Sequence, residues 1–204
     1  GVHAAGSLDD GLIGQQTWPR FAASMAPKAG GAWQLHRMTA DLALDFFVMF
    51  SSAVSMLGGA GQGNYAAANA FLDGLAHERQ AQGLPALSIN WGPWAEAGMA
   101  ATLDARSQDR LTRRGWGHLS SADGLEAFGR LLGDPAPQVG VLPVDWSVVA
   151  DARSGAAGSL LSELRRGQGP AGPDVTRNVH RAVSGAALRP GDSRMERAGE
   201  AELF

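Results

Sequence analysis

The chain has 204 residues, of which 45% are hydrophobic, and its formal net charge is −3. This length suits one domain of ordinary size plus a tail. The small net charge without a basic stripe argues against nucleic-acid binding, and no apolar run reaches the roughly 18 residues that a membrane span needs.

The first segments predict the end of a strand and then an interrupted helix. Residues 2–6 (VHAAG) read as the end of a strand that began earlier. Because the chain starts with Gly rather than Met and opens on this strand end, we expect it to be a fragment or a piece of a larger polypeptide. The first residues show no signal-peptide pattern. Thr17 is a suitable N-cap, with Pro19 just inside the helix that follows. Pro27 and the pair Gly30–Gly31 predict a kink in this helix, or two short helices.

Three apolar runs predict parallel strands that are covered on both faces, because each run is continuous rather than alternating. They occupy residues 45–52, 85–92 and 139–146. Alternation of such strands with helices predicts a right-handed α/β fold with a parallel sheet.

Two helices are expected between these strands. The first runs from about Asn64 to Gln82 and is closed by Gly83. The second covers residues 121–133, with Ser120 or Ser121 as its cap.

The remaining segments are connections. Residues 95–120 are long for a connection and read either as a lid over a site or as an ordinary surface excursion. Residues 152–175 are rich in Gly, Ala and Pro, which predicts a short helix followed by a linker. No periodicity is visible from 176 to 204. We therefore assign residues 1–150 to one domain and residues 151–204 to a flexible C-terminal tail.

The residue types exclude several kinds of chemistry. Cysteine is absent, so disulfides and thiol catalysis are ruled out, and we expect a cytoplasmic protein. The five histidines form no metal-ligand motif, so no metal site is predicted.

Polar residues gather where the predicted strands end, which is where open α/β sheets bind ligands. Ser51 and Ser52 end the first long strand, and Tyr65, the only tyrosine, opens the following helix. Asn69 lies four residues later on the same helix face, and the alanines around it keep that helix slim. Taken singly, each residue is equally well explained by packing, capping or solvent exposure.

Together, the segments PKAGGA, FVMFSSAVS and NYAAAN resemble the ketoreductase domain of modular polyketide synthases, a branch of the short-chain dehydrogenase/reductase family. The resemblance runs from Val2 to about Trp146. An ordinary member of the family has Lys four residues after the tyrosine, whereas this chain has Asn69 there and a lysine at Lys28, as these ketoreductases do. The spacing also matches, because Ser52 follows Lys28 by 24 positions and Tyr65 follows Ser52 by 13.

The resemblance implies catalytic roles for Tyr65, Ser52, Lys28 and Asn69. Tyr65 donates a proton to the β-keto oxygen of an acyl thioester, and Ser52 hydrogen-bonds the same oxygen. Lys28 favours the phenolate and lowers the pKa of Tyr65. Asn69 anchors the lysine or a water that resupplies the proton.

The resemblance also implies NADPH as the cofactor. Ala4, Ala5 and Gly6 resemble the segment that lines the nucleotide cleft, and Gly92 and Pro93 resemble the loop against the nicotinamide. The family's first three strands, and the phosphate-binding glycine loop that follows the first of them, lie upstream of Gly1. The chain therefore resembles the C-terminal half or so of the family's Rossmann-like, doubly wound parallel fold. We therefore expect the chain alone to bind NADPH poorly, and micromolar binding in a fluorescence titration would contradict this expectation.

The product configuration and the partner are also implied. Leu8, Asp9 and Asp10 resemble the motif of B-type ketoreductases, which set a D-configured hydroxyl. Asn64 agrees with this type, and Leu57 stands where the opposite type carries Trp. Ala60 departs from the B-type pattern, which has a proline there. The family's substrate is tethered to an acyl carrier protein, and the other synthase domains are further partners. The tail contains no Asp-Ser-Leu attachment motif.

Other functions remain as alternatives. The chain could keep the fold as a non-catalytic module, or it could belong to another short-chain reductase, although Asn69 counts against the latter. A serine hydrolase is disfavoured because the sequence has no G-x-S-x-G motif.

Overall fold

The computed structural model describes residues 1–96, 105–146, 148 and 179–180. These residues form a single five-stranded sheet whose spatial order follows the chain order, β1-β2-β3-β4-β5. The strands are β1 (Val2–His3), β2 (Val48–Ser52), β3 (Leu87–Trp91), β4 (Gln138–Val141) and β5 (Val179–His180). The first four are parallel, and β5 pairs antiparallel with β4.

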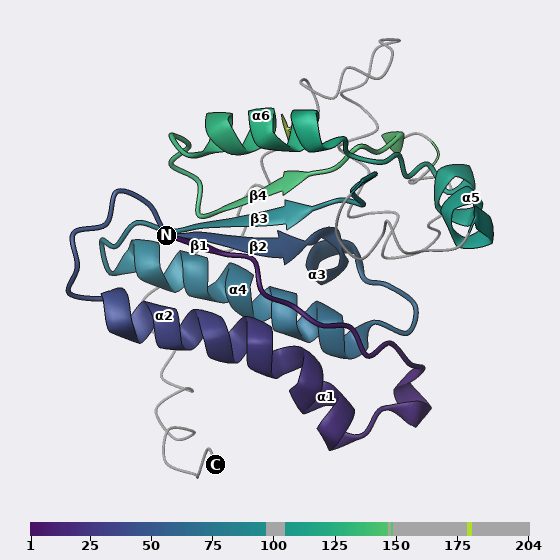
Figure 1. Ribbon diagram of the computed structural model, residues 1–204, viewed down its shortest axis with the longest axis horizontal. Coiled ribbons are helices and arrows are strands. Elements are labelled where there is room, and N and C mark those ends of the chain that lie inside the picture. Colours follow the sequence, from purple (N-terminus) through teal and green to yellow (C-terminus); the bar gives the residue numbers. More distant parts are fainter. Residues whose placement is uncertain (97–104, 147, 149–178, 181–204) are drawn as a thin grey trace, which may run out of the picture.

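Helices cover both faces of the sheet, which confirms the predicted Rossmann-like α/β class. One face is covered by α6, and the other by α4 together with α1 and α2 (Figure 1). The helical segments are η1 (Ile13–Gln15), α1 (Trp18–Met25), η2 (Ala26–Gly30), α2 (Gly31–Thr39), α3 (Ala53–Leu57), α4 (Gly63–Ala81), α5 (Ala105–Arg113) and α6 (Ser121–Leu131).

The predicted strands are confirmed with one shift. Each apolar run contains a strand, but β4 ends at Val141 rather than near Trp146. Pro143 lacks an N–H and cannot continue the ladder. Val144 pairs instead with Trp116 in an isolated antiparallel bridge.

The predicted interruption of the first helix near Pro27 is present, because α1 and α2 are separated by a π-helical segment. Thr17 occupies the N-cap position, although its side chain makes no capping hydrogen bond. Around Pro27 the helix changes to a π-turn, η2, and then continues as α2. Pro27 cannot donate to the carbonyl of Ala23 four residues earlier. Ser7 Oγ donates to that carbonyl instead, at 2.7 Å.

The other two predicted helices are confirmed. α4 ends at Ala81, and Gly83 follows with a φ of 75°, the left-handed conformation that glycine adopts most easily. Ser120 caps α6, because its side chain accepts a hydrogen bond from the backbone N–H of Asp123 at 3.1 Å. The short helix α3, the helix α5 and the strand β5 were not predicted.

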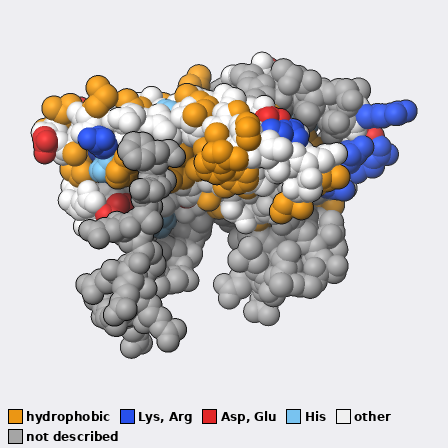
Figure 2. All heavy atoms as spheres, turned by 90° about the horizontal axis from the view of Figure 1, so that it is seen from below, with side chains coloured by type: hydrophobic (Ala, Val, Ile, Leu, Met, Phe, Trp, Pro, Cys, Tyr) orange, Lys and Arg blue, Asp and Glu red, His pale blue; other side chains and the backbone are white. Residues whose placement is uncertain are grey.

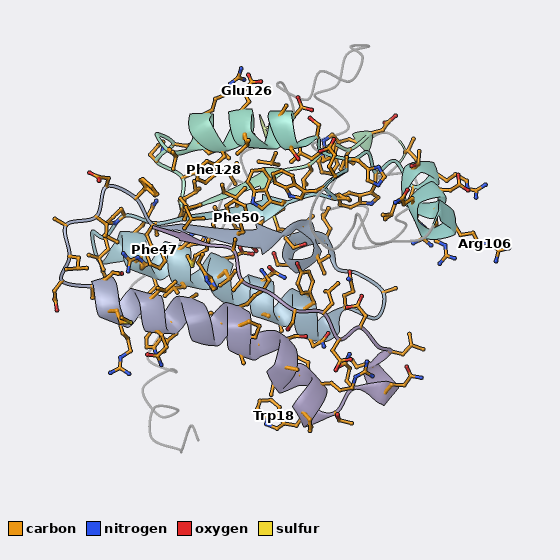
Figure 3. The ribbon with its side chains drawn as sticks, in the orientation of Figure 1. Trp18, Phe47, Phe50, Arg106, Glu126 and Phe128 are labelled. Atoms are coloured by element: carbon orange, nitrogen blue, oxygen red, sulfur yellow. The ribbon has the colours of Figure 1, made fainter. Side chains whose placement is uncertain are left out.

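Three apolar clusters form the core of the described residues, and the two larger ones lie on opposite faces of the sheet. Towards α6, side chains of β2, β3 and β4 pack against Leu131, with Phe50 and Phe128 at the margin. In Figure 3 these two rings lie between the sheet and α6, and their centroids are 5.9 Å apart. Towards α4 and α2, Phe47 and Met49 pack against apolar residues of both helices.

The outer surface of α1 and α2 keeps several large apolar side chains exposed. Trp18 is 77% exposed and Met38 is 73% exposed. Figure 2 views the molecule from this side and shows hydrophobic side chains scattered among polar ones. None of the helices within the described ranges has the length and apolarity to cross a membrane.

Some predictions lie outside the described residues. They concern the helix and linker at 152–175 and nearly all of the tail at 176–204. In the connection 95–120 the structure describes 95–96 and 105–120, and its role as a lid stays a prediction.

Candidate active site

The four candidate catalytic residues converge at the carboxyl edge of the sheet. Ser52 is the last residue of β2, and Tyr65 and Asn69 lie in the first two turns of α4. Lys28 reaches the same place from η2, and its Nζ lies 5.6 Å from the centroid of the Tyr65 ring. Their roles stay predictions, but their proximity is a property of the fold.

The π-turn places Lys28. Its side chain is 3% exposed, and Nζ donates to the carbonyl of Phe50 on β2 at 2.8 Å. The backbone carbonyl of Lys28 accepts from His3 Nε2 at 3.0 Å, so this histidine nitrogen carries the proton. A Cβ at Gly6 would lie 3.0 Å from Lys28 Cε, so a side chain at this position would press against the lysine. Insertions of the π type often occur at functional positions.

Lys28 loses its proton more easily than an exposed lysine. Burial disfavours the ammonium and lowers the pKa of Lys28 from 10.5 to about 8, while the negative charge of Asp73 acts in the opposite direction. At pH 7 the side chain is therefore still mainly protonated.

Tyr65 is 8% exposed, and burial raises its pKa above 10. Hydrogen bonding with the side chains of Asn69 and Ser52 lowers the pKa in part. The pKa of Tyr65 was expected to be lowered, but it is raised, because desolvation of the phenolate is the largest effect. The phenol keeps its proton at neutral pH.

The two neighbours of the phenol are held by backbone contacts. Asn69 Nδ2 donates to the carbonyl of Tyr65 at 2.8 Å, while Asn69 Oδ1 is buried and has no hydrogen-bond partner among the described residues. Ser52 Oγ accepts from the N–H of Val54 at 3.3 Å as the N-cap of α3. The Ser52 hydroxyl proton is not used by that contact.

Ser51 is not at the edge of the site. Its side chain is buried, and its Oγ donates to the backbone carbonyl of Asn69 at 3.3 Å. It therefore fixes α4 to β2 beneath the candidate catalytic residues.

The loop that carries Leu8, Asp9 and Asp10 is tied to the mouth of α4. Asn64, which is fully buried, donates from Nδ2 to the carbonyl of Asp9 at 2.8 Å. Arg20 pairs with Asp9 at 2.5 Å and lowers the pKa of that carboxyl. These contacts give the loop a fixed path beside Tyr65.

The remaining residues of this loop and the stereocontrol set lie at the rim. Asp10 accepts from Gln62 Nε2 at 2.9 Å, and Leu8 is 40% exposed. Leu57 ends α3 and packs at the margin of a third apolar cluster with Leu142.

The predicted cofactor residues lie where two strands end. Ala4, Ala5 and Gly6 follow β1 and are exposed, so their backbone is open to a ligand at the carboxyl edge. Gly92 has a different explanation, because a Cβ there would lie 2.7 Å from Cδ of Pro143. Packing against the end of β4 therefore accounts for this glycine.

Sequence analysis missed a buried polar network below the site. Asp73 on α4 accepts hydrogen bonds from Ser55, Ser88 and Asn90. Asn90 Oδ1 in turn accepts from Gln138 Nε2 at 3.0 Å. The available signal was the spacing of Asp73 from Tyr65 and Asn69, eight and four residues, which places all three on one side of α4.

The helix α5 is strongly basic and lies at the same end of the molecule as the strand ends (Figure 1). Residues 105–114 contain four arginines and one acidic residue, Asp109. Figure 2 shows basic side chains gathered at this end. Arg106 points away from the rest of the molecule in Figure 3. No group of three or more His, Cys, Asp or Glu side chains that could hold a metal occurs within the described ranges.

Comparison with known proteins agrees with this geometry. Residues 1–96 match the family model of the KR domain. The chain is 46% identical over 198 residues to the spectinabilin polyketide synthase system protein NorB of Streptomyces orinoci, which covers 95% of this chain and 9% of that protein. The chain thus spans less than a tenth of the length of this relative.

Solved ketoreductases share the fold. A structure described as A-type ketoreductases from a modular polyketide synthase superposes with a TM-score of 0.73 at 38% identity, covering 81% of this chain and 35% of that one. The first ketoreductase of the tylosin polyketide synthase gives 0.67 at 43% identity, covering 74% and 33%. The chain therefore belongs to the ketoreductase (KR) domain family of polyketide synthases.

Proposed function

We propose that this chain carries the proton-transfer side of an NADPH-dependent β-ketoreductase in polyketide biosynthesis. The reaction reduces the β-keto group of an acyl thioester, tethered to an acyl carrier protein, to a β-hydroxyl. The observation that carries this proposal is the convergence of Lys28, Ser52 and Tyr65 at the carboxyl edge of the sheet.

The residues present fit the nicotinamide end of the cofactor. The exposed backbone of Ala4, Ala5 and Gly6 opens at the same edge as Ser52, and Pro93 follows the end of β3 there. When bound, the reduced nicotinamide supplies the hydride for the ketone carbon.

Tyr65 is suited to act as the acid. Because burial raises its pKa, the phenol holds its proton until the ketone oxygen becomes a strongly basic alkoxide. The proton then passes from Tyr65 Oη to that oxygen, and the phenolate that remains faces the buried ammonium of Lys28.

Ser52 is suited to orient the same oxygen. Its Oγ already accepts from the backbone N–H of Val54, which fixes the oxygen and leaves its own hydrogen free to donate. A donor aimed at developing negative charge is worth more in a buried site than in water.

Lys28 and Asn69 are suited to restore the proton. Lys28 Nζ uses one N–H on Phe50, which leaves two donors, and its pKa of about 8 permits release near neutral pH. The free Oδ1 of Asn69 is a buried acceptor at which a water could be held between the two.

The D configuration rests on the loop of Leu8, Asp9 and Asp10. This loop is held beside Tyr65 by Asn64 and Arg20, so it is placed to guide the substrate from one side. Chiral analysis of the β-hydroxyacyl product tests this part, and an L product would contradict it.

Tyr65→Phe tests the function itself. In the full-length protein that carries this sequence, we expect kcat to fall by about 100- to 10,000-fold, the usual contribution of a positioned acid. The assay follows NADPH oxidation with a β-ketoacyl thioester. Only one oxygen is removed, so NADPH binding and the melting temperature serve as controls and should hold. An unchanged rate would overturn the proposal.

A further inference from the structure

Asp73 is a buried carboxylate that the proposed reaction does not use. Its residue is 7% exposed, and it lies on α4 one turn beyond Asn69 and two turns beyond Tyr65. Within the described ranges it forms no ion pair. A buried carboxylate without a direct cation must be held by hydrogen-bond donors.

Donors from two neighbouring elements meet this carboxylate. Ser88 Oγ on β3 donates to Oδ1 at 2.6 Å, and Ser55 Oγ on α3 donates to Oδ2 at 2.6 Å. Asn90 Nδ2 on β3 lies 3.0 and 2.9 Å from the two oxygens. Asp73 therefore joins α4, α3 and β3 at one point.

The same donors reach the backbone of Ser52. Ser55 Oγ lies 2.9 Å from the carbonyl oxygen of Ser52, and Asn90 Nδ2 lies 3.3 Å from it. Without the carboxylate, the Ser55 hydroxyl and the Asn90 amide would lose this acceptor and would redistribute their hydrogen bonds around the Ser52 carbonyl. The position of the Ser52 hydroxyl then depends on Asp73 through Ser55 and Asn90.

The carboxylate also bears on the charge of Lys28. His3 on β1 donates to the backbone carbonyl of Lys28, and Lys28 Nζ lies 5.6 Å from the centroid of the Tyr65 ring. The negative charge of Asp73 on α4 raises the pKa of Lys28 against the effect of burial. Burial lowers the pKa of His3, and the pKa of Tyr65 is raised, so both are neutral near pH 8. Asp73 is the anionic member of this set.

We propose that Asp73 is a positioning residue of the reductase site: its carboxylate fixes the end of β2 beneath Ser52 and balances the buried positive charge of Lys28. The effect on catalysis rests on the proposed function, whereas the effect on Lys28 does not. A purely structural role would hold the elements together without altering the titration of the lysine.

The first test measures Lys28 in the full chain by NMR of its side-chain nitrogen, assigned with Lys28→Met. In Asp73→Asn we expect the midpoint of the Lys28 titration to move to lower pH, because the nearby negative charge is gone. Ser88→Ala is the matched control, since it removes one donor to the carboxylate and keeps the charge. Equal midpoints in wild type and Asp73→Asn would overturn the charge balance.

The second test uses kinetics in the full-length protein. Asp73→Asn should lower kcat by up to about 100-fold, as expected for a displaced catalytic group, and should move the alkaline limb of the pH profile to lower pH. Ser55→Ala breaks the link to Ser52 and keeps the charge, so kcat should fall while the limb stays in place. If the wild type is active and neither variant has a lower kcat than the wild type, the positioning role is wrong.

Failure to fold would also be informative. If Asp73→Asn alone does not fold, the double variant with Lys28→Met should recover the fold, because the unbalanced cation is removed as well. A double variant that is still unfolded would contradict the charge balance. If the wild type itself does not reduce the thioester, the proposed function fails, and the Lys28 titration still decides the role of Asp73.

Discussion

The two faces of β3 (Leu87–Trp91) are both buried but differ in chemistry. On β3, Leu87, Ile89 and Trp91 join the apolar cluster beneath α6. The residues between them, Ser88 and Asn90, are fully buried and turn towards the polar network of α4. The five-residue strand β3 therefore has one apolar face and one hydrogen-bonded face.

This difference divides the tasks of the fold. Apolar packing beneath α6 contributes stability through area removed from water, which is non-directional. The polar face contributes little net stability for each hydrogen bond, but it fixes directions and distances. The candidate catalytic residues stand at the edge of the polar face, where geometry matters most.

The largest effect on stability should come from the apolar face. Ile89→Ala removes a fully buried side chain and should lower the free energy of unfolding by about 2–5 kcal/mol. Its neighbour provides the control, because Ser88→Ala loses one hydrogen bond to the Asp73 carboxylate and should cost about 1.5–3 kcal/mol. Urea unfolding of both variants measures the contrast, and equal losses would show that the two faces are not energetically different.

The sequence predicted the apolar face better than the polar one. Continuous apolar runs located β2 and β3 because burial on both faces selects such runs. The polar pair Ser88 and Asn90 has a meaning only after the register places Asn90 opposite Ser51 and α4 brings Asp73 across. Such contacts join residues far apart in the chain, so no local pattern contains them.

The candidate site shows the same limit. Resemblance to a family named Lys28, Ser52, Tyr65 and Asn69, and the fold brings these residues together. Pro27 predicted an irregularity in the helix, but the sequence did not show that it would be a π-turn, nor that Ser7 would donate to the Ala23 carbonyl. The pKa of Tyr65 was misjudged because its burial was not visible in the sequence.

An intermediate effect should depend on pH and arise only on the polar face. The pKa of Lys28 is about 8 in the folded chain against 10.5 as its ordinary value, so the unfolded chain binds more protons between these values. Stability contributed by this group therefore rises with pH across that window, by about 3 kcal/mol in full. Below pH 8 both states are protonated and the difference is constant.

Lys28→Met isolates this term. The difference in unfolding free energy between wild type and variant, measured by urea at pH 7.5 and at pH 9.5, should shift in favour of the wild type as the pH rises. Both measurements stay below the range in which Tyr65 titrates, since burial raises its pKa. The deficit of Ile89→Ala should not change between the two pH values. A flat difference for Lys28→Met would mean that the lysine is less buried than its 3% exposure indicates.

The smallest effect concerns the helix that covers the apolar face. Ser120 caps α6 through the N–H of Asp123, so Ser120→Ala should lower the free energy of unfolding by about 1 kcal/mol. Ser120→Thr keeps a capping oxygen and should lose less. The helix start is also held from outside, because Ser121 donates from N and Oγ to Glu96 Oε2, both at 2.8 Å. If Ser120→Ala and Ser120→Thr are equally destabilising, the hydrogen bonds from Ser121 to Glu96, rather than the Ser120 cap, fix the start of α6. The packing of α6 on the sheet would then depend on the connection after β3 that carries Glu96.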